Sequence, residues 1–385
     1  MKKQHIILAS ASIAIIALSV SCKKKDVTTT PTSPSGPSYT IPTTYNGFTN
    51  VDHIESTTII GMTTELTSEL AKGAGTGTTP VPLDINHLLG LLRNQGGQFT
   101  NAPSYDATYN TSGYQIEDNC IPVSQAQLES YLDTLVAVSN SGTAASYGVA
   151  GVGVTLDATP RRYLLTGNGI NYAQVLTKNL MCDLVLYQIV NRVGQTYQLD
   201  NTTLNTYGSV QATTAEHNWD VAFGYYSVSD SFPTVTTPLK LWGSYSNQLD
   251  AGLGCNAIVM NAFLKGRAAI QNKDMATAQQ QANIISNEFD IMTAGAVCQE
   301  LNEIKTAYTA HDAVKVCSAL SECKGLIMSM YNNKSSSRKI TDYQIQQLLN
   351  LFPANHWNVT TQDLTNIGNY MAEIYGFTPA QMLIL

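Results

Sequence analysis

A histidine and two carboxylic acids lie within about one helical turn in the stretch Ala215–Tyr226, whose sequence is AEHNWDVAFGYY. In a helix, Glu216 and Asp220 are i,i+4 neighbours and His217 and Asp220 are i,i+3 neighbours, so the three groups share one patch. A histidine and a carboxylate one turn apart can coordinate a metal ion or act as an oriented base. We therefore take His217 and Asp220 as candidate ligands of iron or zinc.

Three residues in and near this patch are candidates for binding a ligand, namely Glu216, Trp219 and Arg267. Arg267 has apolar neighbours in the predicted helix 256–270. We therefore expect it to form a buried ion pair with Glu216 or Asp220.

The same residues also fit a purely structural role. In that interpretation Glu216 and His217 form a hydrogen-bonded anchor between helices, while Trp219 and Phe223 fill the core. Two protein ligands do not complete a zinc or iron site, which needs a third or fourth donor. The chain contains neither H-E-x-x-H nor G-x-S-x-G, so we assign no catalytic residue and favour a non-enzymatic protein.

Local signals predict that this stretch is a helix. Thr213 or Thr214 supplies an N-cap hydroxyl for the amides of the first turn, and Glu216 opposes the positive end of the helix. Gly224 lies one turn beyond Asp220, where the missing side chain would let another backbone approach closely.

Apolar residues recur at helical spacing along most of the chain, whereas alternating runs long enough for a sheet are missing. This pattern predicts an all-α fold of two packed helical bundles, residues 43–226 and 240–385. From residue 171 onward the predicted helices span 171–190, 215–226, 256–270, 274–292, 293–308, 313–331, 341–351 and 360–375.

Two shorter motifs bear on the first half. Ser124 followed by Gln127 matches a capping box at the start of a helix. The glycine-rich run Gly148–Gly153 superficially resembles a dinucleotide-binding loop, but its flanks show no strand followed by a helix. We expect a flexible surface loop or a small hairpin there.

The N-terminus has the features of an exported lipoprotein. A basic start and a short apolar run in residues 1–21 predict a signal peptide. Leu18–Cys22 resembles a bacterial lipobox, which would make Cys22 the lipidated first residue. The alternative is a plain secretory peptide cut after Ser21. Residues 22–42, rich in Thr, Ser and Pro, predict a flexible tether.

The charge of the predicted body excludes one class of partner. Residues 43–385 carry 16 basic and 27 acidic side chains, a net charge of −11. Nucleic acid would require clustered Lys and Arg. We therefore expect no nucleic-acid partner, and we expect membrane attachment through the lipid alone.

The six cysteines after Cys22 follow an export signal, so disulfides are chemically allowed. None is spaced C-x-x-C, which argues against a structural zinc site. Cys182 lies in an apolar helical pattern and is predicted to be a small buried residue. Cys298 could join Cys317 or Cys323 to staple two C-terminal helices, and a free thiol is the alternative.

Several segments resemble a Bacteroidetes lipoprotein family known only as a domain of unknown function; they are Tyr109–Gly113, Ala215–Tyr225, Asn261–Ile270 and Leu320–Glu322. The resemblance covers essentially the whole mature chain. It implies a lipid-anchored, all-helical outer-membrane protein and brings no established reaction.

A more distant resemblance is to imelysin-like proteins, two-bundle helical envelope proteins with a glycine, one residue, histidine, two residues and glutamate as signature. His217 and Asp220 reproduce the histidine-to-acid spacing, while Ala215 replaces the glycine and Asp220 the glutamate. Such proteins are linked to iron uptake and were once described as metallopeptidases.

An internal duplication would require a second copy of the motif. Ser318–Ile327 aligns with His217–Tyr226 without a gap and matches Gly224 with Gly325. Ser318 takes the histidine position, so this copy lacks an imidazole.

These features predict a lipid-anchored outer-membrane protein, facing the periplasm or the surface, that binds a small ligand or iron in nutrient acquisition. The alternative is a glycan- or partner-binding envelope protein, since its 20 tyrosines and 3 tryptophans can form a carbohydrate-binding surface. A metallopeptidase is the least favoured class.

Overall fold

The computed structural model describes residues 39–333, 335–336 and 338–385. The predicted signal peptide, the lipidation site Cys22 and most of the predicted tether lie outside these residues. Residues Tyr39–Leu385 form one compact unit. Tyr39, assigned to the tether from sequence, already belongs to this unit, because its hydroxyl donates a 3.0 Å hydrogen bond to Oδ2 of Asp274.

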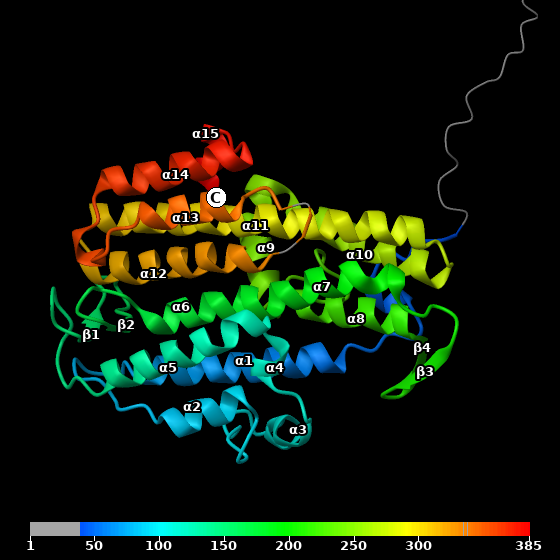
Figure 1. Ribbon diagram of the computed structural model, residues 1–385, viewed down its shortest axis with the longest axis horizontal. Helices are drawn as coiled ribbons and strands as arrows, with labels where there is room; N and C mark the ends of the chain where they lie inside the picture. Colours follow the sequence, from blue (N-terminus) through cyan, green and yellow to red (C-terminus); the bar gives the residue numbers. More distant parts are fainter. Residues whose placement is uncertain (1–38, 334, 337) are drawn as a thin grey trace, which may run out of the picture. The chain divides into compact units, whose positions relative to one another are not determined.

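Helices make up most of the described residues (Figure 1), which confirms the predicted helical class. The helices are α1 (Ile54–Lys72), α2 (Ile85–Leu92), α3 (Asp106–Thr111), α4 (Ile116–Asn119), α5 (Gln125–Ser139), α6 (Tyr172–Asn179), α7 (Tyr187–Gln195), α8 (Thr214–Tyr226), α9 (Leu241–Leu253), α10 (Cys255–Gln271), α11 (Met275–Thr309), α12 (Ala313–Ser329), α13 (Asp342–Asn350), α14 (Thr361–Tyr375) and α15 (Pro379–Ile384).

Two small hairpins correct the all-α expectation. Strand β1 (Gly151–Val154) pairs antiparallel with β2 (Arg162–Leu165), and β3 (Leu204–Tyr207) pairs antiparallel with β4 (Val210–Thr213). Each strand has four residues, too few to give a clear alternating pattern in the sequence. The first hairpin contains part of the glycine run, so the small-hairpin prediction is confirmed there.

Helix α11 is the longest element and joins two predicted helices into one. It spans 35 residues and packs against α10, α12, α7 and α14. The predicted break at Thr293 is absent, and the Thr293 hydroxyl donates a 2.7 Å hydrogen bond to the carbonyl of Phe289, one turn earlier in the same helix.

The predicted helix 171–190 contains a change of helical type. Its N-cap is Asn171, as predicted, whose side chain accepts a hydrogen bond from the amide of Gln174. Between α6 and α7, however, Leu180–Leu186 forms a π-helical segment. Such wider turns are uncommon and often occur at functional sites.

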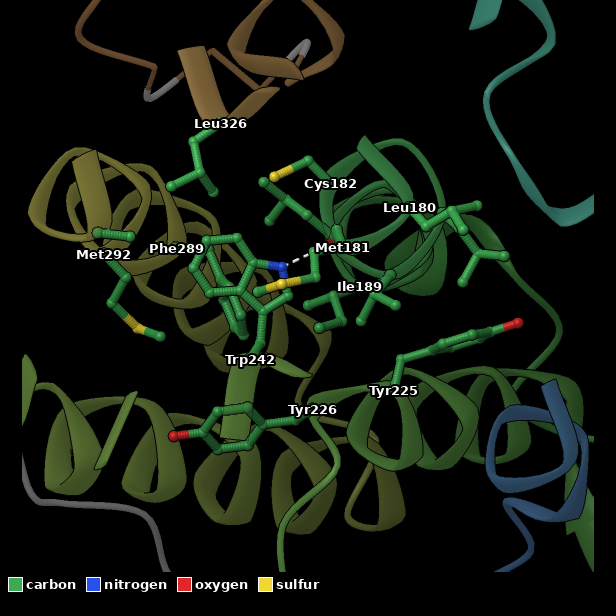
Figure 2. Close-up of a cluster of buried hydrophobic side chains, with 14 of the residues drawn as sticks. Leu180, Met181, Cys182, Ile189, Tyr225, Tyr226, Trp242, Phe289, Met292 and Leu326 are labelled. Atoms are coloured by element: carbon green, nitrogen blue, oxygen red, sulfur yellow. Dashed lines mark hydrogen bonds between the residues drawn. The ribbon is translucent and has the colours of Figure 1, made fainter. Parts of the chain in front are cut away.

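One hydrophobic cluster contains residues from both predicted bundles (Figure 2). The indole of Trp242 donates a 2.6 Å hydrogen bond to the carbonyl of Met181 and lies edge-on to Phe289. Tyr226 also packs edge-on against Phe289. The elements on either side of residues 226–240 thus share a core.

One local prediction in this core is wrong, and the structure decides between the two alternatives for the cysteines. Helix α5 begins at Gln125, but the Ser124 hydroxyl donates to the carbonyl of Ile121 and forms no cap. Cys298, Cys317 and Cys323 are free thiols, fully buried where α11 and α12 pack together. They fill space as small apolar residues and form no bridge.

Candidate functional site

Helix α8, which carries the sequence-predicted site, begins at a capping box. The hydroxyl of Thr213 accepts a 3.2 Å hydrogen bond from the amide of Glu216, and Glu216 Oε2 accepts a 2.9 Å bond from the amide of Thr213. The first of the two predicted caps is therefore the one used. Glu216 is fixed at the start of the helix by its own backbone neighbours.

Arg267 of α10 connects both acids of α8. Its Nε donates a 2.7 Å hydrogen bond to Asp220 Oδ1, and its Nη1 donates a 3.1 Å bond to Glu216 Oε1. The guanidinium is fully buried. The predicted buried ion pair is therefore confirmed, with both acids as partners.

The segment before α1 completes this buried cluster. The Tyr45 hydroxyl donates a 2.7 Å hydrogen bond to Asp220 Oδ1, and Arg267 Nη2 donates a 2.7 Å bond to the side-chain oxygen of Asn50. The ring of Tyr45 stacks on Phe223 with centroids 3.6 Å apart. We call Tyr45, Asn50, Glu216, Asp220 and Arg267 the arginine anchor.

Burial and pairing act in opposite directions on the acids of the arginine anchor. Burial raises the pKa of Asp220 to about 6, and the guanidinium of Arg267 opposes that shift. Burial also works against the charge of Glu216, but the Thr213 amide and Arg267 keep the pKa of this carboxyl below its usual value. The arginine anchor therefore depends on the guanidinium that faces both acids.

Trp219 and Gly224 of α8 have packing roles. The fully buried indole of Trp219 donates a 3.0 Å hydrogen bond to the carbonyl of Phe263. A Cβ on Gly224 would lie 2.0 Å from Ser56 Oγ and 2.8 Å from His53 Cβ, so the predicted close approach is confirmed and α1 makes it.

His217 and Asp220 have different partners. The His217 ring stacks on Tyr207 at 3.7 Å, and its Nδ1 lies 3.9 Å from Asp52 Oδ1. Burial lowers the pKa of His217. Across the described residues, no group of three or more His, Cys, Asp and Glu side chains could hold a metal ion. His217 and Asp220, the two predicted metal-binding residues, therefore share no partner in the structure.

An open groove lies elsewhere, between α7 and α11. It encloses about 350 Å³ and, among the described residues that line it, none carries a charge. The lining consists of apolar, hydroxyl and amide side chains: Leu186, Tyr187, Val190, Asn191, Gly194, Gln195, Tyr197, Gln279, Asn283, Ser286, Asn332, Asn333, Ser335 and Ser336. We call this the amide groove.

Several polar groups of the amide groove are available to a ligand. Within the described chain, no hydrogen bond ties the side chains of Gln279, Asn283 and Ser286 to another residue. Gln195 Nε2 donates a 2.7 Å bond to Asn191 Oδ1, which leaves the amide nitrogen of Asn191 and the oxygen of Gln195 for other partners.

Two buried acids hold one wall of the amide groove. Asn332 donates a 2.6 Å hydrogen bond to Oδ1 of Asp183, in the π-helical segment, and Asn333 donates a 3.5 Å bond to Oδ1 of Asp290. Burial raises the pKa of Asp183 to about 7 and also raises that of Asp290. The side chains of Asn332 and Asn333 are therefore held in place by hydrogen bonds to buried acids.

Comparison with models of protein families assigns the chain to one family. A domain of unknown function, DUF4856, matches residues 38–378. The chain belongs to the DUF4856 family. This match confirms the part of the resemblance that concerns a domain of unknown function. Neither the curated proteins nor the solved structures provide a match.

Within this DUF4856 domain, the sequence predicted the pairing of Arg267 with the acids of α8, but it predicted neither the contacts of Tyr45 and Asn50 nor the amide groove. The available signal was a repeat of polar residues one turn apart, Tyr187, Asn191 and Gln195 in one helix and Gln279, Asn283 and Ser286 in another. The two rows of polar residues come together because α7 packs against α11.

Among the helices of the described residues, none has both the length and the hydrophobicity that a membrane-spanning segment needs.

Proposed function

We propose that this DUF4856 protein is a non-enzymatic binding protein of the cell envelope whose amide groove holds an uncharged, hydroxyl-rich ligand, a glycan. The observation that carries the proposal is the lining of the amide groove, in which the described side chains combine amides, hydroxyls and tyrosine rings without a charge. Its volume of about 350 Å³ lies within the range of ligand pockets.

The chemistry of the lining favours sugars over ions. Amide side chains both donate and accept hydrogen bonds, which matches the hydroxyl groups of a sugar. Tyr187 and Tyr197 add aromatic rings, and Leu186 and Val190 add an apolar floor for the C–H faces of a sugar ring. A charged ligand would lose its hydration without gaining an opposite charge.

The arginine anchor has a structural role. Its carboxylates and its guanidinium are buried and bonded to one another. Ligand binding by Glu216 or Arg267 would require this cluster to open, and Trp219 is itself fully buried against Phe263. We therefore assign these three residues a structural role that fixes α8 and α10 behind the exposed surface.

The imelysin-like architecture and its internal duplication remain part of the proposal. One observation supports the duplication. A Cβ on Gly325 would lie 3.0 Å from Lys178 Cβ and 3.1 Å from the Val175 carbonyl, so α12 approaches α6 at this glycine as α8 approaches α1 at Gly224. Both glycines of the proposed repeat thus serve close contacts between helices.

Attachment to the outer membrane through a lipid on Cys22 is a separate proposal, supported by the lipobox-like sequence. Radiolabelled palmitate should enter the wild-type protein in its bacterial host and should be absent from Cys22→Ala, which should leave the membrane fraction. Equal labelling of both proteins would contradict lipidation at this residue.

A glycan array followed by isothermal titration calorimetry tests the proposed function. We expect neutral glycans to bind and Gln279→Ala to weaken their binding. Gln280→Ala is the matched control, because Gln280 is exposed on the same helix and lies outside the amide groove. The absence of binding by any glycan, or equal weakening in both variants, would contradict the proposal.

A further inference from the structure

The polar residues of the amide groove form two facing rows along helices. Tyr187, Asn191 and Gln195 follow one another at four-residue spacing along α7. Gln279, Asn283 and Ser286 follow one another at spacings of four and three residues along α11. Each row therefore advances by about one helical turn, roughly 5.4 Å, at every step.

The two helices run in opposite directions beside each other (Figure 1). Asn201, beyond the end of α7, donates a 3.3 Å hydrogen bond to Met275, the first residue of α11. Met181, before α7, and Phe289, further along α11, both contact Trp242. Tyr187 therefore lies at the level of Ser286, and Gln195 at the level of Gln279.

One end of this double row is closed. The next turn beyond Tyr187 and Ser286 would place Asp183 opposite Asp290, and both acids are buried with about 1% exposure. Asn332 and Asn333 bind these acids and so occupy that level. At the other end Gln195, Tyr197 and Gln279 are exposed, which leaves the row open.

We infer that the amide groove recognises the end of a linear neutral polysaccharide, with about three sugar units lying along α7 and α11. The inference rests on the proposed function and adds the shape and orientation of the ligand. Three levels, one helical turn apart, span about 11 Å along α7, and a sugar unit in a linear chain has a length close to one turn. The terminal unit lies against Asn332, Tyr187 and Ser286, and the chain leaves past Gln195.

Calorimetry with oligosaccharides of increasing length tests this inference. The probes are malto-, cello-, laminari- and xylo-oligosaccharides of one to six units. In the series that binds, we expect affinity to rise at least about tenfold from one unit to three, with less than a twofold change from four units to six. Equal affinity for one and three units, or a continued rise beyond four, would overturn the inference.

Variants at the two ends of the groove provide a second readout. Ser286→Ala at the closed end should weaken binding of every length. Gln279→Ala at the open end should weaken trisaccharide binding and leave monosaccharide binding unchanged, and Gln280→Ala should change neither. Equal weakening of the monosaccharide and the trisaccharide by Gln279→Ala would overturn the inference.

The two proposals fail in different ways. Binding without the expected dependence on length overturns the recognition of a chain end and leaves the proposed glycan function in place. Absence of binding in all four series and on the glycan array, with melting temperatures that show folded protein, contradicts the proposed function and the inference with it.

Discussion

Arg267 Nε lies 2.7 Å from Asp220 Oδ1 in a region where both side chains are fully excluded from solvent. A buried ion pair is costly to form, because both charges lose their hydration, and costly to break, because one charge is left without a partner. In the arginine anchor Asp220 also accepts a hydrogen bond from Tyr45, and Arg267 donates one to Asn50, so the pair joins the start of the folded chain to α8 and α10.

Replacing Arg267 should therefore destabilise the protein strongly. Arg267→Glu places three acids together, and we expect a loss of at least about 3–5 kcal/mol in the free energy of unfolding, measured by chemical denaturation. Arg161→Glu is the control, because Arg161 is half exposed and pairs with Glu303 at the surface; it should cost about 1 kcal/mol or less. An unchanged melting temperature in Arg267→Glu would refute the structural role of the arginine anchor.

The buried acid behind the amide groove should make stability depend on pH. Burial raises the pKa of Asp183 to about 7, whereas an unfolded aspartate has a pKa near 3.9. The folded protein therefore binds the proton more tightly, and this contribution is full below about pH 4 and lost as pH rises through 7.

Asp183→Asn isolates this contribution, since the amide mimics the protonated acid and can still accept the hydrogen bond from Asn332. We expect the melting temperature of the wild type, relative to that of Asp183→Asn, to fall as pH rises from 4 to 8. The difference between the folded and unfolded pKa values limits this loss in the free energy of unfolding to roughly 4 kcal/mol. Parallel melting profiles of the two proteins across this range would contradict the assignment.

All six described cysteines should be reduced and protected. They are buried, and burial raises the pKa of Cys298 and Cys317 to about 12. We expect iodoacetamide to modify none of the six in the native protein and all of them in denaturant, as measured by intact mass. A disulfide between Cys298 and Cys317 or Cys323 would leave two of them unmodified in denaturant without reductant.

Elemental analysis tests the metal hypothesis for His217 and Asp220. Because these side chains have different partners, we expect His217→Ala to have the same iron and zinc content as the wild type. His311→Ala, at an exposed histidine, is the control. Stoichiometric iron or zinc in the wild type and in His311→Ala, but not in His217→Ala, would contradict this expectation and support a metal site at His217.

The sequence predicted features that depend on neighbours within one helix or on strong electrostatic rules. The cap at Thr213 and the helical conformation of α8 follow from local hydrogen bonding. The pairing of Arg267 follows from the cost of burying a charge alone among apolar neighbours.

Features that depend on packing between distant segments could not be predicted. Tyr45 and Asn50 lie beside a Thr- and Pro-rich segment, and nothing local shows that they reach Asp220 and Arg267. The amide groove forms where α7 and α11 run in opposite directions beside each other (Figure 1). Each row alone has the composition of an ordinary exposed helix face.

Filling the amide groove tests its role most directly. Gly194 lines the groove, and a Cβ placed there would meet no atom within 4 Å. Leucine also has a higher helix propensity than glycine, by up to about 1 kcal/mol. Gly194→Leu should therefore fill the groove and keep the fold intact.

The decisive measurement is calorimetric titration of Gly194→Leu with the oligosaccharide that binds the wild type best. We predict at least a tenfold loss of affinity with a melting temperature equal to or above that of the wild type, while Gln280→Leu, outside the groove, retains wild-type affinity. Unchanged affinity in Gly194→Leu would show that glycans bind elsewhere and would contradict the central claim.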